Sequence, residues 1–387
     1  MIIGFARLAL ALAAGISVLP AAAQAQLAVS ANDNKAYLDN GVAKTVPNAQ
    51  PDTVAIIDLS ANPPKLLAEL QAPASVVGPP GSVAVAADES FALVTSAMKV
   101  DPADPTKQVP DDRLSVIDLK SSPPKVTQTV TVGKGAAGVS INKAGTLALV
   151  ANRSEGTVSV LTISGGKVEE KEKIKLGEAN SGPSHPIFTR DGAMALVTRD
   201  NDHKISVLTV AGDKVEYGKR DINAGLRPYQ IDTTGNGDVA IVANIGIGGG
   251  DADTISVIDL KAKPSRVVNT VTVGQTPEGL KMSPDGQHVA VTVMNGSNKP
   301  KESPFFNDFG LVKIFRLSGH NLTQVAEAPV GHWCQGAAWS KDGKQILVQC
   351  MVEKEIFAFS FDGGKNLQKI GSIKTNGGAA GIRTAEP

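Results

Sequence analysis

A short strand rich in Val, Ile and Leu recurs along the chain with little change. Three close copies span residues 54–59, 114–119 and 255–260, and each ends in the pair Asp-Leu. Looser copies span residues 158–163, 205–210, 312–317 and 356–361. A strand that returns once per supersecondary unit indicates a repeat architecture. The seven copies therefore predict seven units.

A second pattern precedes most of these strands. It has a Gly-rich start, a short apolar strand, a tight turn of the Asp-Gly or Asn-Gly kind and a strongly apolar strand, most clearly at residues 274–293. Other copies begin at Gly78, Gly133, Gly177, Gly225 and Gly331. Such turns indicate hairpins, because Gly adopts positive φ at little cost. Units of four strands whose starts lie 44 to 57 residues apart match the blades of a β-propeller.

The C-terminal end of the repeat region contains a strand that the N-terminal unit lacks. Residues 35–38 are the candidate second strand of the first unit, before its recurring third strand, but no clear Gly-rich first strand precedes them. Residues 376–383 resemble the Gly-rich strand at 133–140. We expect this C-terminal strand to pair with the N-terminal blade, because closure removes the exposed edges of an open array. The predicted fold class is all-β, a closed seven-bladed β-propeller over residues 26–387.

Three units are lengthened between their second and third strands, at residues 97–113, 245–253 and 294–309. Long loops on one face of a repeat fold commonly mark a binding surface, so this long-loop face is the predicted binding face. One of the loops carries Asp251 and Asp253, but calcium needs six or more oxygen ligands and the pattern is incomplete. A flexible loop is the favoured interpretation.

Residues 1–25 have the pattern of a signal peptide, with Arg7, an apolar stretch at 8–19 and Ala-Gln-Ala before the expected cleavage. The apolar stretch is too short for a spanning helix, so we expect a periplasmic protein with no membrane span after cleavage. The 38 basic and 38 acidic residues give no net attraction to nucleic acid or to an anionic membrane. The expected partner is a periplasmic protein or a small ligand, and the protein is expected to be a monomer.

The two cysteines, Cys334 and Cys350, flank the turn at residues 341–344. If that turn closes a hairpin, the cysteines lie nearly opposite one another on adjacent strands. Export to an oxidising compartment favours a structural disulfide. The alternative is a metal or redox pair, which the absence of a CxxC spacing disfavours.

Residues 149–160, with Leu-Val-Ala-Asn followed by Thr-Val-Ser-Val, resemble the signature of the YVTN-repeat β-propellers. Residues 241–244 with 254–257, and 196–199 with 205–207, carry the same signature in looser form. The resemblance implies the propeller fold over nearly all of the mature chain. That family includes exported proteins of unassigned role, surface-layer proteins and relatives of seven-bladed lactonases and carboxymuconate cyclases. The Pro-Arg-His triplet usual in the lactonase-like relatives is absent from every unit, which puts inherited lactonase chemistry in doubt.

The first strands of the units are expected to start at one mouth of the central channel. The equivalent positions there are Gly81, Ala137, Ser184, Tyr229, Glu278, Gln335 and Ala380, with His185, Arg227 and Trp333 one residue away. In an enzyme, Glu278, His185 and Arg227 would be the catalytic base, acid and oxyanion clamp. In a binding protein, Ser184, Tyr229, Gln335 and Trp333 would contact the ligand. The alternative to both is that these residues have no specific ligand, because the channel mouth of any propeller is hydrated and polar.

No P-loop, dinucleotide fingerprint, CxxCH haem motif or HExxH motif is present, so no cofactor or metal is expected. The favoured function is binding of a partner protein or small ligand through the long-loop face. The alternative is an enzyme resembling the lactonases or carboxymuconate cyclases, acting at the channel mouth.

Overall fold

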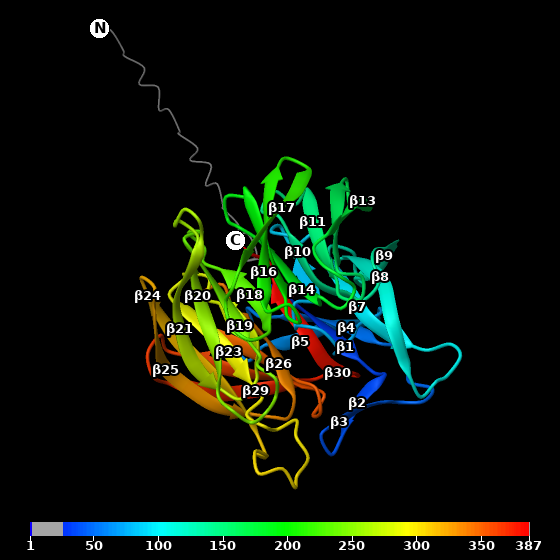
Figure 1. Cartoon of the computed structure of the whole chain (residues 1–387), viewed down its shortest axis with the longest axis vertical. Coiled ribbons are helices and arrows are strands. Elements are labelled where there is room, and N and C mark those ends of the chain that lie inside the picture. The colour runs from blue at the N-terminus through cyan, green and yellow to red at the C-terminus, as the bar shows by residue number, and fades with distance from the viewer. Residues whose placement is uncertain (2–25, 387) are drawn as a thin grey trace.

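Seven four-stranded antiparallel sheets surround a central channel in this structure, a computed structural model that describes Met1 and residues 26–386. The first strands of successive sheets contact one another around the ring, so they line the channel (Figure 1). The predicted seven-bladed, all-β propeller is confirmed. The predicted signal peptide falls on residues 1–25, of which 2–25 lie outside the described residues.

The four strands of each blade follow one another from the channel outward. Blade 1 contains β30 (Gly378–Thr384), β1 (Leu27–Asp33), β4 (Thr53–Asp58) and β5 (Lys65–Gln71). Blade 2 contains β6 (Val83–Val85), β7 (Phe91–Val100), β8 (Gln108–Asp118) and β9 (Lys125–Thr131), and blade 3 contains β10 (Ala136–Ile141), β11 (Leu147–Asn152), β12 (Thr157–Ser164) and β13 (Lys167–Lys175). Blade 4 contains β14 (Pro183–Phe188), β15 (Met194–Arg199), β16 (Lys204–Ala211) and β17 (Lys214–Ile222), and blade 5 contains β18 (Pro228–Thr233), β19 (Val239–Asn244), β20 (Asp253–Asp259) and β21 (Arg266–Gly274). Blade 6 contains β22 (Pro277–Met282), β23 (His288–Val293), β24 (Gly310–Ser318) and β25 (Asn321–Val330), and blade 7 contains β26 (Cys334–Trp339), β27 (Gln345–Cys350), β28 (Glu355–Phe361) and β29 (Leu367–Lys374).

The ring closes in blade 1, where β30 pairs with β1 in antiparallel register, for example Val29 with Arg383. Figure 1 shows red β30 beside blue β1. The closure predicted for the C-terminal strand is confirmed, but the candidate strand at 35–38 was wrong as the second strand of this blade. Asp33 ends β1 by accepting hydrogen bonds from the backbone N–H groups of Lys35 (2.7 Å) and Ala36 (3.0 Å). Beyond this turn, β2 (Ala36–Asp39) and β3 (Val42–Thr45) form a separate hairpin.

The Asp that ends the three closest copies of the recurring strand has a local structural role. The carboxylates of Asp58, Asp118 and Asp259 each accept a hydrogen bond from the backbone N–H two residues later, at 2.9, 2.8 and 2.8 Å. Asp residues commonly stabilise turns in this way. The repeated Asp therefore marks where each third strand turns toward the rim.

Burial falls from the channel to the rim of each blade. In blade 3 every residue of β11 is buried, whereas β13 alternates and is mostly exposed. Each inner strand is covered on both faces by neighbouring blades, so most of its residues are apolar, and a buried polar residue such as Asn152 has hydrogen-bond partners in Thr157 and Ser159. The small and β-branched side chains of this chain suit such stacked sheets.

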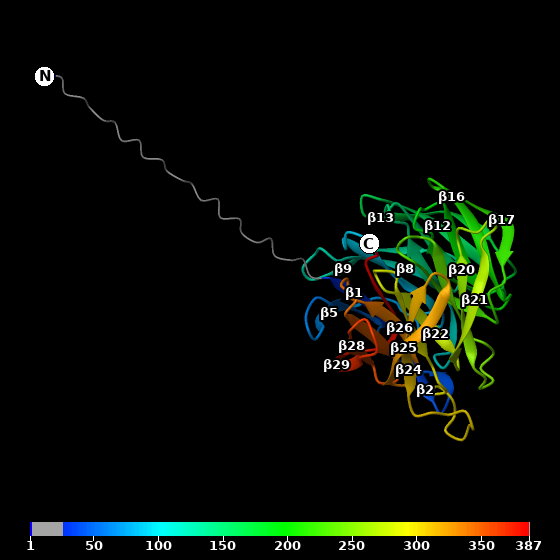
Figure 2. The same ribbon diagram turned by 90° about the vertical axis from the view of Figure 1, so that its left-hand side faces the viewer.

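Two of the three long connections lie together with the β2–β3 hairpin on one face (Figure 2). The Lys299 amine donates a 2.6 Å hydrogen bond to the Gly248 carbonyl, and Asn40 accepts a 2.9 Å bond from the backbone N–H of Lys301. The connection at 97–113 is instead largely an extension of β7 and β8. The residues described, 26–386, include no helix with the length and apolarity that a membrane crossing requires.

Cys334 and Cys350 face one another on β26 and β27 and form a disulfide, as predicted. The bond crosses the first two strands of blade 7 where the channel begins. Because both sulfurs are bonded, neither is available as a thiolate ligand for a metal.

Ile382 provides a test of the closure. Its side chain is fully buried on β30 and packs with residues of blades 1 and 7. We expect Ile382→Ala to lower the free energy of unfolding by about 2–5 kcal/mol, because the substitution leaves a cavity where the ring closes. Urea denaturation followed by circular dichroism measures this change. The control Leu66→Ala, on β5 with 41% exposure, should lower it by less than about 1 kcal/mol; equal losses would contradict the role of the closure.

Candidate functional site

A recurring β-bulge places the candidate residues at one mouth of the channel. In blades 3 to 7 the pairing of the first two strands shifts register near the start of the first strand. Ser184, Tyr229, Glu278 and Gln335 lie within these shifts, in blades 4 to 7. Bulges redirect side chains away from the regular pleat, and they are common next to functional sites. We call this end, on the same face as the long loops, the loop-face mouth.

Two arginines and an aspartate form an ion-pair network at the loop-face mouth. Arg153 and Arg227 both pair with the buried carboxylate of Asp200, at 2.6 and 2.8 Å. Arg153 also donates a hydrogen bond to the Ser184 hydroxyl and lies over the ring of Tyr229, 5.5 Å from its centroid. Burial alone would raise the pKa of Asp200, but these partners hold it below its usual value.

Arg153 and Asp200 were missed by the sequence reasoning. Each is the first residue after the second strand of its blade, β11 and β15. The same position holds an apolar residue in three other blades, namely Ile245, Met294 and Met351. A charged residue at an otherwise apolar repeat position was therefore the available signal.

Glu278 is a second acid of the loop-face mouth, in addition to Asp200. Its partly buried carboxylate accepts a 3.0 Å hydrogen bond from the side-chain amide of Gln335. Burial raises the pKa of Glu278 to about 8, although Gln335, Arg227 and Arg153 act in the opposite direction. A carboxyl with such a pKa can hold or release a proton near neutral pH.

A cover formed by neighbouring segments lies over this mouth. The Val76 carbonyl accepts a hydrogen bond from the Gln335 amide (3.3 Å), and the Val76 N–H donates to Asp33 (2.8 Å). Trp333 packs against a buried cluster of Ala36, Val76, Met351 and Ala380. The structure thus places Trp333 and Gln335 in contact with this cover.

His185 faces the other end of the channel from Glu278 and Arg227. Its Nδ1 accepts a hydrogen bond from the backbone N–H of Ile231 (3.4 Å), and its ring lies so close to Gly81 that a Cβ there would approach to 2.3 Å. Burial, together with Arg383 and Lys281, holds the pKa of His185 well below its usual value, so the ring is neutral. Glu278, His185 and Arg227, predicted as base, acid and oxyanion clamp, do not form one site. His185 lines a cavity that Glu278 and Arg227 do not line.

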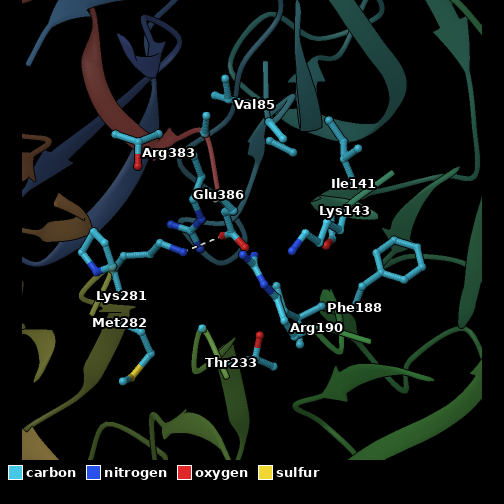
Figure 3. Close-up of a pocket in the computed structure, with 18 of the residues that line it drawn as sticks. Val85, Ile141, Lys143, Phe188, Arg190, Thr233, Lys281, Met282, Arg383 and Glu386 are labelled. Atoms are coloured by element: carbon cyan, nitrogen blue, oxygen red, sulfur yellow. Dashed lines mark hydrogen bonds and ion pairs between the residues drawn. The ribbon is translucent and has the colours of Figure 1, made fainter. Parts of the chain in front are cut away.

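This cavity, of about 390 Å³, opens at the end of the channel formed by the turns between first and second strands. We call this end the turn-face mouth. Figure 3 shows its lining, in which charged and apolar side chains point inward from several blades. The charged members include Lys143, Arg190, Lys281, Arg383 and Glu386, and the apolar members include Val85, Ile141, Phe188 and Met282. Sequence reasoning identified only His185 among these residues.

The loop with Asp251 and Asp253 is occupied by contacts within the protein. Asp253 accepts a 2.9 Å hydrogen bond from the Thr276 N–H. The Gly248 carbonyl accepts a hydrogen bond from the Lys299 amine. Burial raises the pKa of Asp253, which disfavours its charged form. These contacts leave few free oxygen ligands at this loop.

The fold and the channel define a seven-bladed β-propeller with a ligand-sized cavity at its turn-face mouth. No protein-family model matches the sequence, and no curated protein matches it either. Solved structures with this fold include a periplasmic gluconolactonase from Pseudomonas aeruginosa, with a TM-score of 0.66, 16% identity, and 94% of this chain and 99% of that chain covered. A candidate 6-phosphogluconolactonase from Bacteroides fragilis gives a TM-score of 0.70 at 16% identity, with the same coverage of both chains. A protein of unknown function from Desulfotomaculum acetoxidans gives 0.67 at 16% identity, also over 94% and 99% of the two chains. At these identities the likeness establishes the fold.

The pKa of Glu278 generates a stability prediction. An unfolded carboxyl ionises near 4.5, whereas folded Glu278 keeps its proton to about 8, so unfolding releases a proton between these values. The free energy of unfolding should therefore fall as the pH rises through this window. Urea denaturation at about pH 5 and about pH 8 should show a smaller fall for Glu278→Gln than for wild type. Glu327→Gln, at a half-exposed carboxylate on β25, should keep the wild-type fall; an unaltered fall in Glu278→Gln would refute the assignment.

Proposed function

We propose that this protein is an exported, monomeric binding protein of the YVTN-repeat type, which holds a small organic ligand in its channel at the turn-face mouth. The observation that carries the proposal is the cavity of about 390 Å³, whose mixed charged and apolar lining is typical of small-ligand sites. The disulfide supports export to an oxidising compartment such as the periplasm.

Binding is favoured over catalysis by the positions of the candidate residues. His185 is neutral and buried at the inner end of the cavity, apart from Glu278 and Arg227. The loop-face mouth carries the cover that includes Val76 and Trp333. A second cavity, of about 380 Å³ and lined by Arg153, lies on the loop face, but Glu278 does not line it. Within the described residues, the turn-face cavity is the one that combines such a volume with charged groups from several blades.

Filling the cavity tests this function. Thr233 is partly exposed at the end of β18 and points into the cavity (Figure 3), so Thr233→Trp should block the cavity and preserve the fold. The measurement is equilibrium dialysis against a periplasmic metabolite extract, followed by mass spectrometry of the retained compounds. We expect retention by wild type and at least about tenfold less by Thr233→Trp. Thr209→Trp, at an exposed site on β16, is the matched control. No retained compound, or equal retention by Thr233→Trp, would contradict the proposal and favour a protein partner on the long-loop face.

A second candidate function is lactone hydrolysis at the loop-face mouth. It is favoured by Glu278, whose pKa of about 8 suits a general base, beside the Arg153–Asp200–Arg227 network. Glu278 would accept a proton from a water molecule that attacks the lactone carbonyl, and Arg227 would stabilise the oxyanion that forms. Two of the three solved structures described above carry lactonase names.

Hydrolysis of sugar and aliphatic lactones by the purified mature protein tests the second candidate. If the protein is a lactonase, Glu278→Gln should lower kcat at least about 100-fold, because the amide cannot accept the proton. Glu327→Gln, which alters a carboxylate on the outer strand β25, should keep wild-type kcat. Hydrolysis that is absent, or that persists in Glu278→Gln, would eliminate this function.

A further inference from the structure

Positive charge dominates the turn-face cavity. Five of its described lining residues are basic, namely Lys143, Arg190, Lys281, Lys341 and Arg383, and three are acidic, namely Asp88, Glu89 and Glu386. Two of the acids are engaged in backbone contacts at the rim. Asp88 accepts a 3.0 Å hydrogen bond from the N–H of Ser90, and Glu89 accepts one of the same length from Leu27. Glu386 is left as the acid that faces the basic groups.

Glu386 is held in the cavity mainly by its charge. Its carboxylate lies 2.5 Å from the amine of Lys281, and Figure 3 shows Arg190 pointing toward it from the opposite side. Burial would raise the pKa of Glu386, but Lys281, Arg383 and Arg190 hold it below the usual value. Glu386 lies beyond the end of β30, and its side chain is 41% exposed. A carboxylate held in this way can exchange with another carboxylate.

Arg383 lacks a full set of acceptors. Its side chain is 4% exposed, and Nη1 donates to the carbonyl of Ile382 at 2.9 Å. Within residues 26–386, Nη2 has no hydrogen-bond partner. A buried cationic donor without a partner is costly, so an additional acceptor at this point would be favourable.

Lys281 already forms an ion pair with an acid buried behind the cavity. Its amine lies 3.0 Å from the buried carboxylate of Asp232, which also accepts a 2.8 Å hydrogen bond from the Met282 N–H. Asp232 neutralises one positive charge behind the cavity surface. The charges of Arg383 and Arg190 remain for an anion inside the cavity.

One wall of the cavity is apolar. Val85, Ile141 and Phe188 lie along this side of the cavity, whereas Met282 lies across it, next to Lys281 (Figure 3). Val85 and Phe188 are each less than 7% exposed. These side chains offer no hydrogen bonds, so they favour the hydrocarbon part of a ligand. The cavity thus combines a cationic subsite with an apolar wall.

We propose that the turn-face cavity binds a small organic acid, with its carboxylate between Lys281, Arg190 and Arg383 and its hydrocarbon body against Val85, Ile141 and Phe188. In the structure the carboxylate of Glu386 occupies the same subsite as an internal competitor. Binding exchanges one carboxylate for another, so the charge of the subsite is unchanged. This inference rests on the proposed function, since it names the class of ligand that the channel holds.

Octanoate is the probe, and octanamide is its uncharged counterpart of the same shape. Isothermal titration calorimetry with the full mature chain measures the Kd of each for wild type, Glu386→Gln, Arg190→Gln and the control Arg266→Gln. We expect Glu386→Gln to bind octanoate at least about tenfold more tightly than wild type, because the competitor no longer occupies the subsite. Arg190→Gln should weaken octanoate binding at least about fivefold. Arg266→Gln, at an exposed arginine on β21, should bind like wild type.

Three outcomes overturn the inference. If octanamide binds as tightly as octanoate and Thr233→Trp abolishes both, the channel binds small molecules but not through a carboxylate, and the proposed function stands. If Glu386→Gln leaves the Kd for octanoate unchanged, Glu386 is not a competitor at the site. If neither probe binds to wild type or to a Glu386→Gln protein with a wild-type circular dichroism spectrum, no carboxylate site exists, and the metabolite dialysis then decides separately on the proposed function.

Discussion

The pairing of β30 with β1 is the constraint on which both the ring and the cavity depend. Without this pairing β1 and β30, both of blade 1, would present unpaired edges, which are prone to association with other chains. The same strand carries Arg383, whose backbone pairs with Val29 and whose side chain enters the channel. It also positions Glu386, three residues further on. Closure of the fold and assembly of the cationic subsite are therefore one event, so the subsite forms only in a completed ring.

The bulge at the start of the first strands lets blades of similar sequence present different chemistry to the channel. The strand pairs themselves vary little, because both faces of each inner strand must pack against neighbouring blades. The redirected positions lie outside the regular pairing of the two strands, and they range from Ala137 to Tyr229 and Glu278. Variation in this propeller is thus concentrated where the chain leaves the regular pleat.

The blades, the closure and the disulfide could be predicted from the sequence because they follow from local periodicity and turn chemistry. The second strand of blade 1 could not, since Leu27 follows directly on the apolar leader and its pattern merges with it. The loop-face residues Ser184, Tyr229, Glu278 and Gln335 were placed at one mouth by their equivalent repeat positions. The turn-face cavity was missed because its lining combines turn residues such as Arg190 with Glu386, and no sequence period relates them. Ser184 and His185 are adjacent residues of one bulge, and their side chains point toward opposite ends of the channel. The local sequence does not determine which of the two points toward the loop face.

The two mouths of the channel neutralise their basic residues in different ways. At the loop face the neutralising acid is a fixed part of the fold, and at the turn face the outer acid is partly exposed. At the loop face, the acid between the two arginines is Asp200, which is fully buried directly after β15, so its ion pairs are a fixed part of the fold. At the turn face, the inner acid, Asp232, is equally buried, but the outer acid, Glu386, is 41% exposed and lies outside any strand. Removing Asp200 would leave Arg153 and Arg227 without this acidic partner, whereas displacing Glu386 with another carboxylate leaves the charges balanced. Neutral His185 lies at the inner end of the cavity and adds no charge to the exchange. A channel with one fixed network and one exchangeable acid is suited to admitting an anionic ligand from the turn face alone.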